Sequence, residues 1–340
     1  MPELAGTVEP MSPTAPQQAM LLAKAGHPFD GLRVLRDAQA QGDREAFLLE
    51  GLWMLEGRFV PRDLLGARRP LGEAADRGHL GAARTLTGLI ASGVGAAPSW
   101  DTALAMLDSW SSRDPIAARQ LELIKRMPLD AEGIPVVDLR VRSVCHDPRI
   151  VRVDGLLSRD ECAFLVQLAE PRMRRATIFH EAEQRFVEDP IRRSDKAAFP
   201  TVSEWPFVRA INLRIAAATG TSAECGEPLQ VLRYQEGQEY RAHVDAIPGM
   251  DNPRVQTALV WLNDDYCGGE TCFSELGIIE RGASGDLLIF ANTCDEGSPD
   301  HRTRHSGAPV TKGIKYLASR WIRSRPPGQE GFGRHEVERA

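Results

Sequence analysis

The sequence lacks any long apolar run, and this absence excludes a membrane-spanning helix. None of its 340 residues lie in an uninterrupted apolar stretch of about 18 residues, the length that a bilayer core requires. The start, Met1-Pro2-Glu3-Leu4, has neither the basic nor the apolar segment of a secretory signal. We therefore expect a cytoplasmic protein with no membrane partner.

Cysteine and positive charge are also scarce. Six cysteines are too few for a disulfide framework in a chain of this length, so reduced thiols are expected. Lys and Arg number 41 against 47 Asp and Glu, a net charge of −6, which argues against nucleic acid as a partner. With 26% charged and 42% hydrophobic residues, the composition is that of a soluble globular protein, and its length allows two domains.

The first part of the chain, residues 17–127, predicts a helical domain, because Ala and Leu recur at helical spacing between glycine-containing breaks. Gly42-Asp43, Gly78-His79 and Arg113-Asp114 precede matched alanines at intervals of 36 and 35 residues. A period in the mid-thirties is typical of helix–turn–helix repeats. The unit from Asp63 to Ala83 resembles a Sel1-like or tetratricopeptide-type repeat; an irregular helical bundle is the alternative.

The rest of the chain predicts a different architecture. Pro128, Gly133 and Pro135 indicate a linker at 128–136, and residues 1–16 and 326–340 are expected to be flexible ends. Ser158 and Glu161 form a capping box that opens a helix ending at Ala169. A second helix is expected at 203–218, after a charged and mobile loop at 190–200. Seven short strands follow, which predict a barrel or jelly roll: 230–234, 238–245, 256–262, 269–273, 286–290, 304–310 and 315–322. The expected class is α+β, with a catalytic domain at 137–325.

Three residues in this strand-rich part suggest a metal centre. His243 and Asp245 are two positions apart, so on a strand both side chains point to the same side. His305, on a later strand, completes a set of two imidazoles and one carboxylate. This ligand set is typical of non-haem Fe(II) oxygenases, because it leaves coordination positions open.

The same part of the sequence contains two alternative sets of candidate metal ligands. His301 lies four positions before His305, a spacing that suits a helix-borne zinc pair, but the intervening residues do not look helical and we expect His301 in a loop. Cys267, Cys272 and Cys294 could join a histidine in a structural zinc site. No second close cysteine pair completes that site, and Cys272 is expected to be a small buried side chain.

Residues 150–324 resemble the catalytic domain of prolyl 4-hydroxylases, within the 2-oxoglutarate- and Fe(II)-dependent dioxygenases. The segment Tyr234 to Asp245 has the family pattern Tyr-x-x-Gly-Gln-x-Tyr-x-x-His-x-Asp. The further motifs occur in the family order: Arg254-Val255-Gln256-Thr257, Leu262-Asn263-Asp264, Gly268-Gly269-Glu270-Thr271-Cys272-Phe273, Gly285-Asp286, and His305 to Val310 followed by Gly313, Lys315 and Trp321. Many relatives carry an aromatic residue just after the position of Asp245, and the five residues that follow Asp245 here include none. This difference leaves the identity of the substrate open.

The resemblance implies a jelly-roll (double-stranded β-helix) fold with flanking helices and a defined chemistry. His243, Asp245 and His305 would be the catalytic Fe(II) ligands, with 2-oxoglutarate and O2 as co-substrates and ascorbate as a further candidate cofactor. Lys315 would pair with the distal carboxylate of 2-oxoglutarate, which is costly to bury unpaired, and Thr271 and Tyr234 would add hydrogen bonds. Tyr240, Trp321, Arg254 and Arg193 match positions on the substrate side.

Three functions remain open at this stage. The first is hydroxylation of a peptidyl proline, with release of succinate and CO2 and with a protein partner docked on the helical repeats. The second is hydroxylation of a small molecule or free amino acid. The third is a non-catalytic adaptor with a relict barrel, against which the intact ligand set and Lys315 argue.

Overall fold

The computed structural model describes residues 12–136, 138–180, 185–188, 191–294 and 297–327. The chain divides into two compact units, Met1–Ala118 and Arg119–Ala340. No helix within the described residues is both long and apolar enough to cross a membrane. Most of the two predicted flexible ends, 1–16 and 326–340, lies outside the described residues, although the first helix already begins at Ala15.

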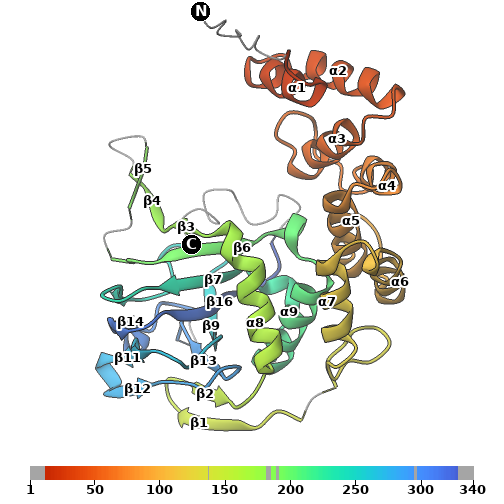
Figure 1. The fold of residues 1–340 in the computed structure, drawn as a ribbon. Coiled ribbons are helices and arrows are strands. Elements are labelled where there is room, and N and C mark those ends of the chain that lie inside the picture. The colour runs from red at the N-terminus through yellow and green to blue at the C-terminus, as the bar shows by residue number, and fades with distance from the viewer. Residues whose placement is uncertain (1–11, 137, 181–184, 189–190, 295–296, 328–340) are drawn as a thin grey trace, which may run out of the picture. The chain divides into compact units, whose positions relative to one another are not determined.

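The first unit is helical, as predicted (Figure 1). Its helices pack in chain order, each against the next from α1 to α6. Their bounds are α1 (Ala15–Lys24), α2 (Pro28–Ala40), α3 (Arg44–Glu56), α4 (Arg68–Asp76), α5 (Leu80–Ser92), α6 (Trp100–Ser111) and α7 (Pro115–Ile124). The division between the compact units falls within α7, and the linker predicted at 128–136 remains a prediction.

One fully buried large side chain per helix recurs every 18 residues. These side chains are Leu35 on α2, Trp53 on α3, Leu71 on α4, Leu89 on α5 and Leu107 on α6, each 2% exposed or less. Two intervals of 18 residues equal the 36 residues that separate the first two sequence repeats. The regular spacing therefore favours true helix-pair repeats over an irregular bundle.

The matched positions of the sequence repeat are helix N-caps. Asp43 accepts hydrogen bonds from the backbone N–H groups of Glu45 and Ala46, and Asp114 accepts one from Ile116. His79 performs the same role through Nδ1, which lies 3.0 Å from the N–H of Ala82. Each cap satisfies a backbone donor that the helix itself leaves without a partner.

The second unit contains two larger sheets and two short ones. The eight-stranded sheet has the order β1-β2-β13-β9-β16-β7-β6-β3, and the four-stranded sheet has the order β12-β11-β14-β8. The strands are β1 (Val141–Cys145), β2 (Ile150–Val153), β3 (Arg174–Arg175), β4 (Thr177–His180), β5 (Arg185–Glu188), β6 (Asp195–Phe199), β7 (Leu229–Tyr234), β8 (Tyr240–His243), β9 (Arg254–Trp261), β10 (Cys267–Gly268), β11 (Thr271–Phe273), β12 (Ile278–Glu280), β13 (Leu287–Ala291), β14 (His305–Gly307), β15 (Val310–Lys312) and β16 (Lys315–Arg323).

The two larger sheets share one core, which is the jelly-roll arrangement expected from the sequence. Leu232, Leu259 and Phe290 of the large sheet belong to the same buried cluster as Phe273 of the small sheet. Helices α8 (Arg159–Ala169) and α9 (Pro206–Thr219) lie on one face of the large sheet (Figure 1) and contact β7 and β9. Phe164 and Phe207 join these two helices edge to face, with ring centroids 4.9 Å apart.

The region before Pro228 contains more strands than predicted. Strands β1 to β6 lie between residues 141 and 199, on both sides of α8, although the sequence analysis expected there only a helix and a loop. The prediction of a loop at 190–200 was wrong for residues Asp195–Phe199. They form β6 and pair with Leu229–Arg233 of β7 in antiparallel register. Asp, Lys and Ala are depleted in strands, so pairing with a neighbouring strand, and not local propensity, makes this segment extended.

Candidate metal centre

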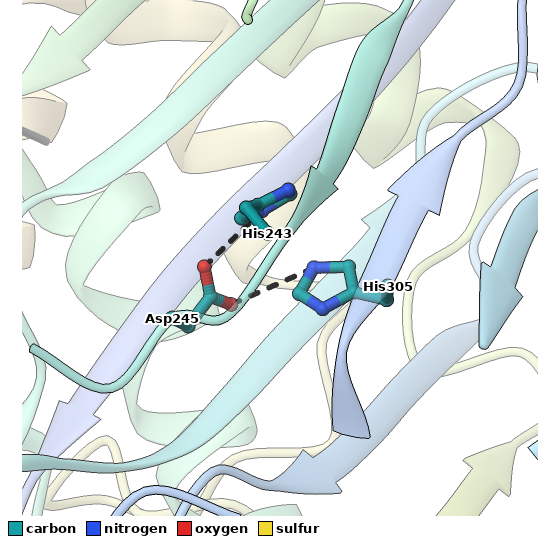
Figure 2. A group of neighbouring side chains, drawn as sticks. All are labelled: His243, Asp245 and His305. Atoms are coloured by element: carbon teal, nitrogen blue, oxygen red, sulfur yellow. Dashed lines mark ion pairs between the residues drawn. The ribbon is translucent and has the colours of Figure 1, made fainter. Parts of the chain in front are cut away.

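The predicted ligands His243, Asp245 and His305 lie together in the structure. Strands β8 and β14 are neighbours in the small sheet, and His243 is the register partner of His305. Asp245 Oδ1 lies 3.4 Å from His243 Nε2, and Asp245 Oδ2 lies 3.8 Å from His305 Nε2. Figure 2 shows the carboxylate directed at both rings. One ligand atom from each residue can be chosen so that all three lie within 4.8 Å of one another, close enough to share one ion.

The local route to this arrangement differs from the predicted one. Asp245 is not on a strand with His243, because β8 ends at His243 and Asp245 lies in the bend that follows. The pairing of β8 with β14 is also irregular. Tyr240 pairs with Gly307 and His243 with His305, so the stretch of β8 between these pairs is one residue longer than that of β14. Such a bulge re-aims side chains, and it lets Tyr240 and His243, three positions apart, stack at 3.6 Å.

Backbone carbonyls determine which ring nitrogen each histidine offers. His243 Nδ1 lies 2.8 Å from the carbonyl oxygen of Arg241, and His305 Nδ1 lies 3.1 Å from that of Thr303. A carbonyl oxygen only accepts, so each Nδ1 donates its proton and each Nε2 keeps its lone pair. The two Nε2 atoms facing Asp245 are therefore suited to bind a metal ion.

The charge states also fit a divalent cation. Burial opposes ionisation of Asp245, but His305, His243 and the Thr257 hydroxyl outweigh it and hold the pKa of the carboxyl well below its ordinary value. Burial lowers the pKa of His305 to about 4 against the attraction of Asp245. At neutral pH the site thus presents a carboxylate and a neutral imidazole, the protonation states that metal binding requires.

A second layer of hydrogen bonds orients the carboxylate. The Thr257 hydroxyl on β9 donates to Asp245 Oδ2 at 2.6 Å, and Asn292 Nδ2 donates to the Thr257 hydroxyl at 2.8 Å. Thr257 is fully buried and Asn292 is 2% exposed, so water does not compete for these bonds. The sequence analysis noted Thr257 only as part of a motif and did not consider Asn292, which directly follows β13, because a single polar residue in or beside a strand carries no signal of such a contact.

The ligands open into a cavity that is also lined by the side chains predicted to bind 2-oxoglutarate. Lys315, Thr271 and Tyr234 line it together with His243, Asp245 and His305. Lys315 begins β16, opposite Tyr234 of β7. Its Nζ donates to the carbonyl oxygen of Gly269 at 2.7 Å and lies 5.5 Å from the centroid of the Tyr234 ring. Burial lowers the pKa of Lys315 to about 8.

The residues predicted on the substrate side divide into two groups. Tyr240 and Trp321 line the cavity, whereas Arg254 and Arg193 do not. Arg254 is buried and makes a bidentate ion pair with Glu227 at 2.6 and 2.8 Å. Its Cζ lies 3.9 Å from the ring centroid of Trp321. Arg192, which the sequence analysis did not select, lines the cavity in place of its exposed neighbour Arg193.

The zinc alternative does not correspond to any group of ligands in the described part of the chain. There, the set His243, Asp245 and His305 is the cluster close enough to hold a metal, and Cys267, Cys272 and Cys294 are free thiols outside it. His301 is exposed in a short 3-10 helix, His301–Thr303, and is also outside the cluster.

Comparisons with known proteins agree with this site. Residues 229–323 match the 2OG-Fe(II) oxygenase superfamily. Prolyl 4-hydroxylase 1 of Arabidopsis thaliana is 32% identical over 215 residues, which cover 58% of this chain and 76% of that protein. The prolyl 4-hydroxylase subunit alpha-1 of Gallus gallus is 34% identical over 193 residues, covering 54% of this chain but 37% of the subunit.

Two solved structures are each similar to part of the chain. The viral collagen prolyl hydroxylase vCPH of Paramecium Bursaria Chlorella virus-1, in its 2OG complex, has 26% identity and a TM-score of 0.41, covering 52% of this chain and 96% of that one. A Sel1 repeat protein from Oxalobacter formigenes has 21% identity and a TM-score of 0.29, covering 34% of this chain and 48% of that one.

The sequence match with the Arabidopsis enzyme and the geometry of the cavity lead to one classification. This chain belongs to the prolyl 4-hydroxylase family of 2-oxoglutarate- and Fe(II)-dependent oxygenases. It is therefore a 2-oxoglutarate-dependent hydroxylase, and the non-catalytic adaptor is excluded as its function. The chain spans little more than a third of the vertebrate subunit.

Proposed function

We propose that this enzyme hydroxylates a proline within a peptide or protein, converting 2-oxoglutarate and O2 to succinate and CO2. One observation carries the proposal: a His–Asp–His cluster and a buried lysine share one cavity in a chain related to prolyl 4-hydroxylases. The cluster suits the metal and the lysine suits the dianionic co-substrate, so both halves of the reaction have a place in the same cavity.

Fe(II) would be held by the Nε2 atoms of His243 and His305 and by the Asp245 carboxylate. When bound with 2-oxoglutarate and O2, the iron supplies the oxidising power that inserts one oxygen atom into a C–H bond. The protein keeps the three ligands in one orientation, because both Nδ1 atoms are tied to backbone carbonyls and Asp245 is tied to Thr257. Only two imidazoles and one carboxylate come from the protein, which leaves coordination positions for the co-substrates.

Lys315 would bind the carboxylate of 2-oxoglutarate that lies farther from the metal. Its ammonium is buried with the carbonyl oxygen of Gly269 as its hydrogen-bond acceptor, so it has donor capacity left for an anion. An entering carboxylate would also raise the pKa of Lys315 and keep it charged. The hydroxyls of Thr271 and Tyr234, which line the same cavity, are placed to add hydrogen bonds.

The substrate proline would enter between aromatic side chains. Tyr240 and Trp321 line the cavity, and aromatic rings offer broad apolar surfaces that suit a pyrrolidine ring. We also propose that the helical repeats of the first unit bind a protein partner, since helical repeats commonly serve as binding surfaces, and that the enzyme acts in the cytoplasm. A role for ascorbate remains a prediction.

The test is a turnover assay with the intact chain, Fe(II) and 2-oxoglutarate. Proline-containing peptides and free proline are offered in parallel, and succinate release and the gain of one oxygen atom by mass spectrometry are measured. We expect succinate and hydroxylated peptide in equal amounts. Hydroxylation of free proline with none of the peptides modified would refute the peptide assignment and favour the small-molecule alternative.

A further inference from the structure

Two consecutive glycines, Gly268 and Gly269, lie beside the lysine that the cavity offers to 2-oxoglutarate. Gly268 ends β10 and Gly269 follows it, and both have positive φ angles, +70° and +69°. The carbonyl oxygen of Gly269 accepts the hydrogen bond from Lys315 Nζ at 2.7 Å. The pair belongs to a motif of the sequence, Gly268–Phe273, but neither glycine has a role in the proposed function.

The missing side chain of Gly269 leaves room for the stem of Lys315. A Cβ added at Gly269 would lie 3.1 Å from Lys315 Cδ. It would also lie 3.2 Å from Val310 Cγ2 and 3.3 Å from Tyr266 Cε2. Separations of 3.0–3.4 Å are tighter than most contacts that a real Cβ makes, so a neighbouring atom would have to move by a few tenths of an ångström.

The surroundings of Gly269 determine which neighbour would move. Val310 and Tyr266 are 1% and 3% exposed, belong to the buried core cluster, and do not line the cavity. Lys315 does line the cavity, so its side chain has open space on one side. Because close-packed interiors resist displacement, the substitution Gly269→Ala would push the lysine stem toward the cavity. The ammonium would then leave its position on the Gly269 carbonyl.

We propose that Gly269 is a positioning residue for 2-oxoglutarate, because it fixes the place at which the Lys315 ammonium meets the distal carboxylate. Two properties of the glycine act together: its carbonyl oxygen orients Nζ, and its lack of a Cβ admits the lysine stem. Gly269 itself does not line the cavity, so it acts through Lys315 alone. The inference rests on the role of Lys315 in the proposed function and deepens it.

The test measures the Kd of 2-oxoglutarate by calorimetry on the full chain, with Mn(II) in place of Fe(II) and without peptide, so that no turnover is needed. For Gly269→Ala we expect the Kd to rise about three- to tenfold, since a misplacement of about 1 Å can cost about a hundredfold and this shift is smaller. Oxalate offers the metal two oxygens but has no distal carboxylate. Its Kd, and that of Mn(II), should stay at the wild-type values.

A second glycine of the same domain provides the matched control. Gly277, just before β12, has a φ of +64°, and a Cβ added there would meet no atom within 4 Å. Gly277→Ala therefore introduces the same left-handed strain without the crowding, and it should bind 2-oxoglutarate as wild type does. The double variant Gly269→Ala/Val310→Ala gives the new Cβ room on the side away from the lysine. Its Kd should lie between those of wild type and Gly269→Ala, and it replaces Gly269→Ala if crowding prevents that variant from folding.

Three results would overturn the inference. The first is a wild-type Kd for 2-oxoglutarate in the folded Gly269→Ala or double variant. The second is an equal loss of affinity for 2-oxoglutarate and oxalate, which would show a general disturbance of the cavity. The third is the same loss in Gly277→Ala, which would assign the effect to backbone strain.

The variant Lys315→Ala separates this inference from the proposed function. If Lys315→Ala leaves the Kd of 2-oxoglutarate unchanged, the role of the lysine in the proposed function fails, and the inference fails with it. If Lys315→Ala weakens binding and Gly269→Ala does not, only the inference about Gly269 fails.

Discussion

His305 on β14 lies directly across from His243 on β8, with the two ring centroids 4.3 Å apart. The residues are far apart in the sequence, and the pairing of two short strands brings them together. Both rings are fixed by a hydrogen bond from Nδ1 to a carbonyl two residues earlier, Arg241 for one and Thr303 for the other. The strand pair thus orients two equivalent Nε2 atoms toward a single point beside Asp245.

The first prediction concerns these imidazoles. His243→Ala or His305→Ala should abolish succinate release and weaken Fe(II) binding, because one of the three protein ligands is lost. Fe(II) binding by titration and circular dichroism of the fold are the measurements. His301→Ala, a change at an exposed histidine outside the cluster, should behave as wild type. Full activity in either ligand variant would contradict the assignment.

The second prediction concerns the lysine in the cavity. Lys315→Ala should raise the KM for 2-oxoglutarate by about two to four orders of magnitude, since removing one partner of a buried ion pair costs about 3–5 kcal/mol. The KM for the peptide should change far less. Lys312→Ala, on the exposed end of β15, is the control. An unchanged KM for 2-oxoglutarate would show that another group binds its carboxylate.

The third prediction is a pH dependence with a defined sign. Because burial lowers the pKa of Lys315 to about 8, the ammonium of the free enzyme loses its proton as the pH rises through that value. The kcat/KM for 2-oxoglutarate should therefore be level below about pH 8 and decline above it, since this ratio reports ionisations of the free enzyme. The variant Lys315→Arg, whose guanidinium stays charged, should lose this decline even if its activity is lower. A decline of the same shape in that variant would assign it to a different group.

The fourth prediction tests the support behind the carboxylate. Thr257→Val keeps the shape of the side chain but removes the hydroxyl that donates to Asp245. Loss of a hydrogen bond to a metal ligand typically weakens metal affinity by about ten- to a hundredfold, so Fe(II) titration should shift by that factor. Thr311→Val, an exposed change on β15, should leave the affinity unchanged. Equal Fe(II) affinity in the two variants would show that the hydroxyl does not support the metal centre.

The fifth prediction concerns the regular core of the helical unit. Leu71→Ala should lower the free energy of unfolding by about 2–5 kcal/mol, because the leucine is fully buried and its truncation leaves a cavity. Leu65, in the same unit, is 63% exposed, and Leu65→Ala should change stability by less than about 0.5 kcal/mol. Thermal and denaturant unfolding would measure both. A similar loss in the two variants would show that the 18-residue spacing does not define the core.

Much of the catalytic domain was predictable because its strand patterns and motifs are short stretches of sequence that can each be recognised separately. The strands expected at 230–234, 256–262 and 315–322 lie within two residues of β7, β9 and β16, since alternating apolar residues and turn glycines mark them. The placement of Tyr234, Thr271 and Lys315 in one cavity with the ligands also agrees with what the family resemblance implied. The helical half was predictable from its period, which the buried side chains at every eighteenth position reproduce.

Other features were decided by contacts between distant segments. Strand β6 is extended because it pairs with β7, and the bulge in β8 aims Tyr240 and His243 at the same cavity although their spacing on a regular strand would separate them. The same pairing along β8 brings Arg192, and not the predicted Arg193, to the cavity wall.

The sequence by itself determined the residue types of the candidate ligands and the order of the elements, because these depend on residue identity and short-range periodicity. Only the tertiary structure decided which side chains line the cavity and which hydrogen bonds orient them. Those properties depend on strand register, and a shift of one residue turns a side chain from one face of a sheet to the other.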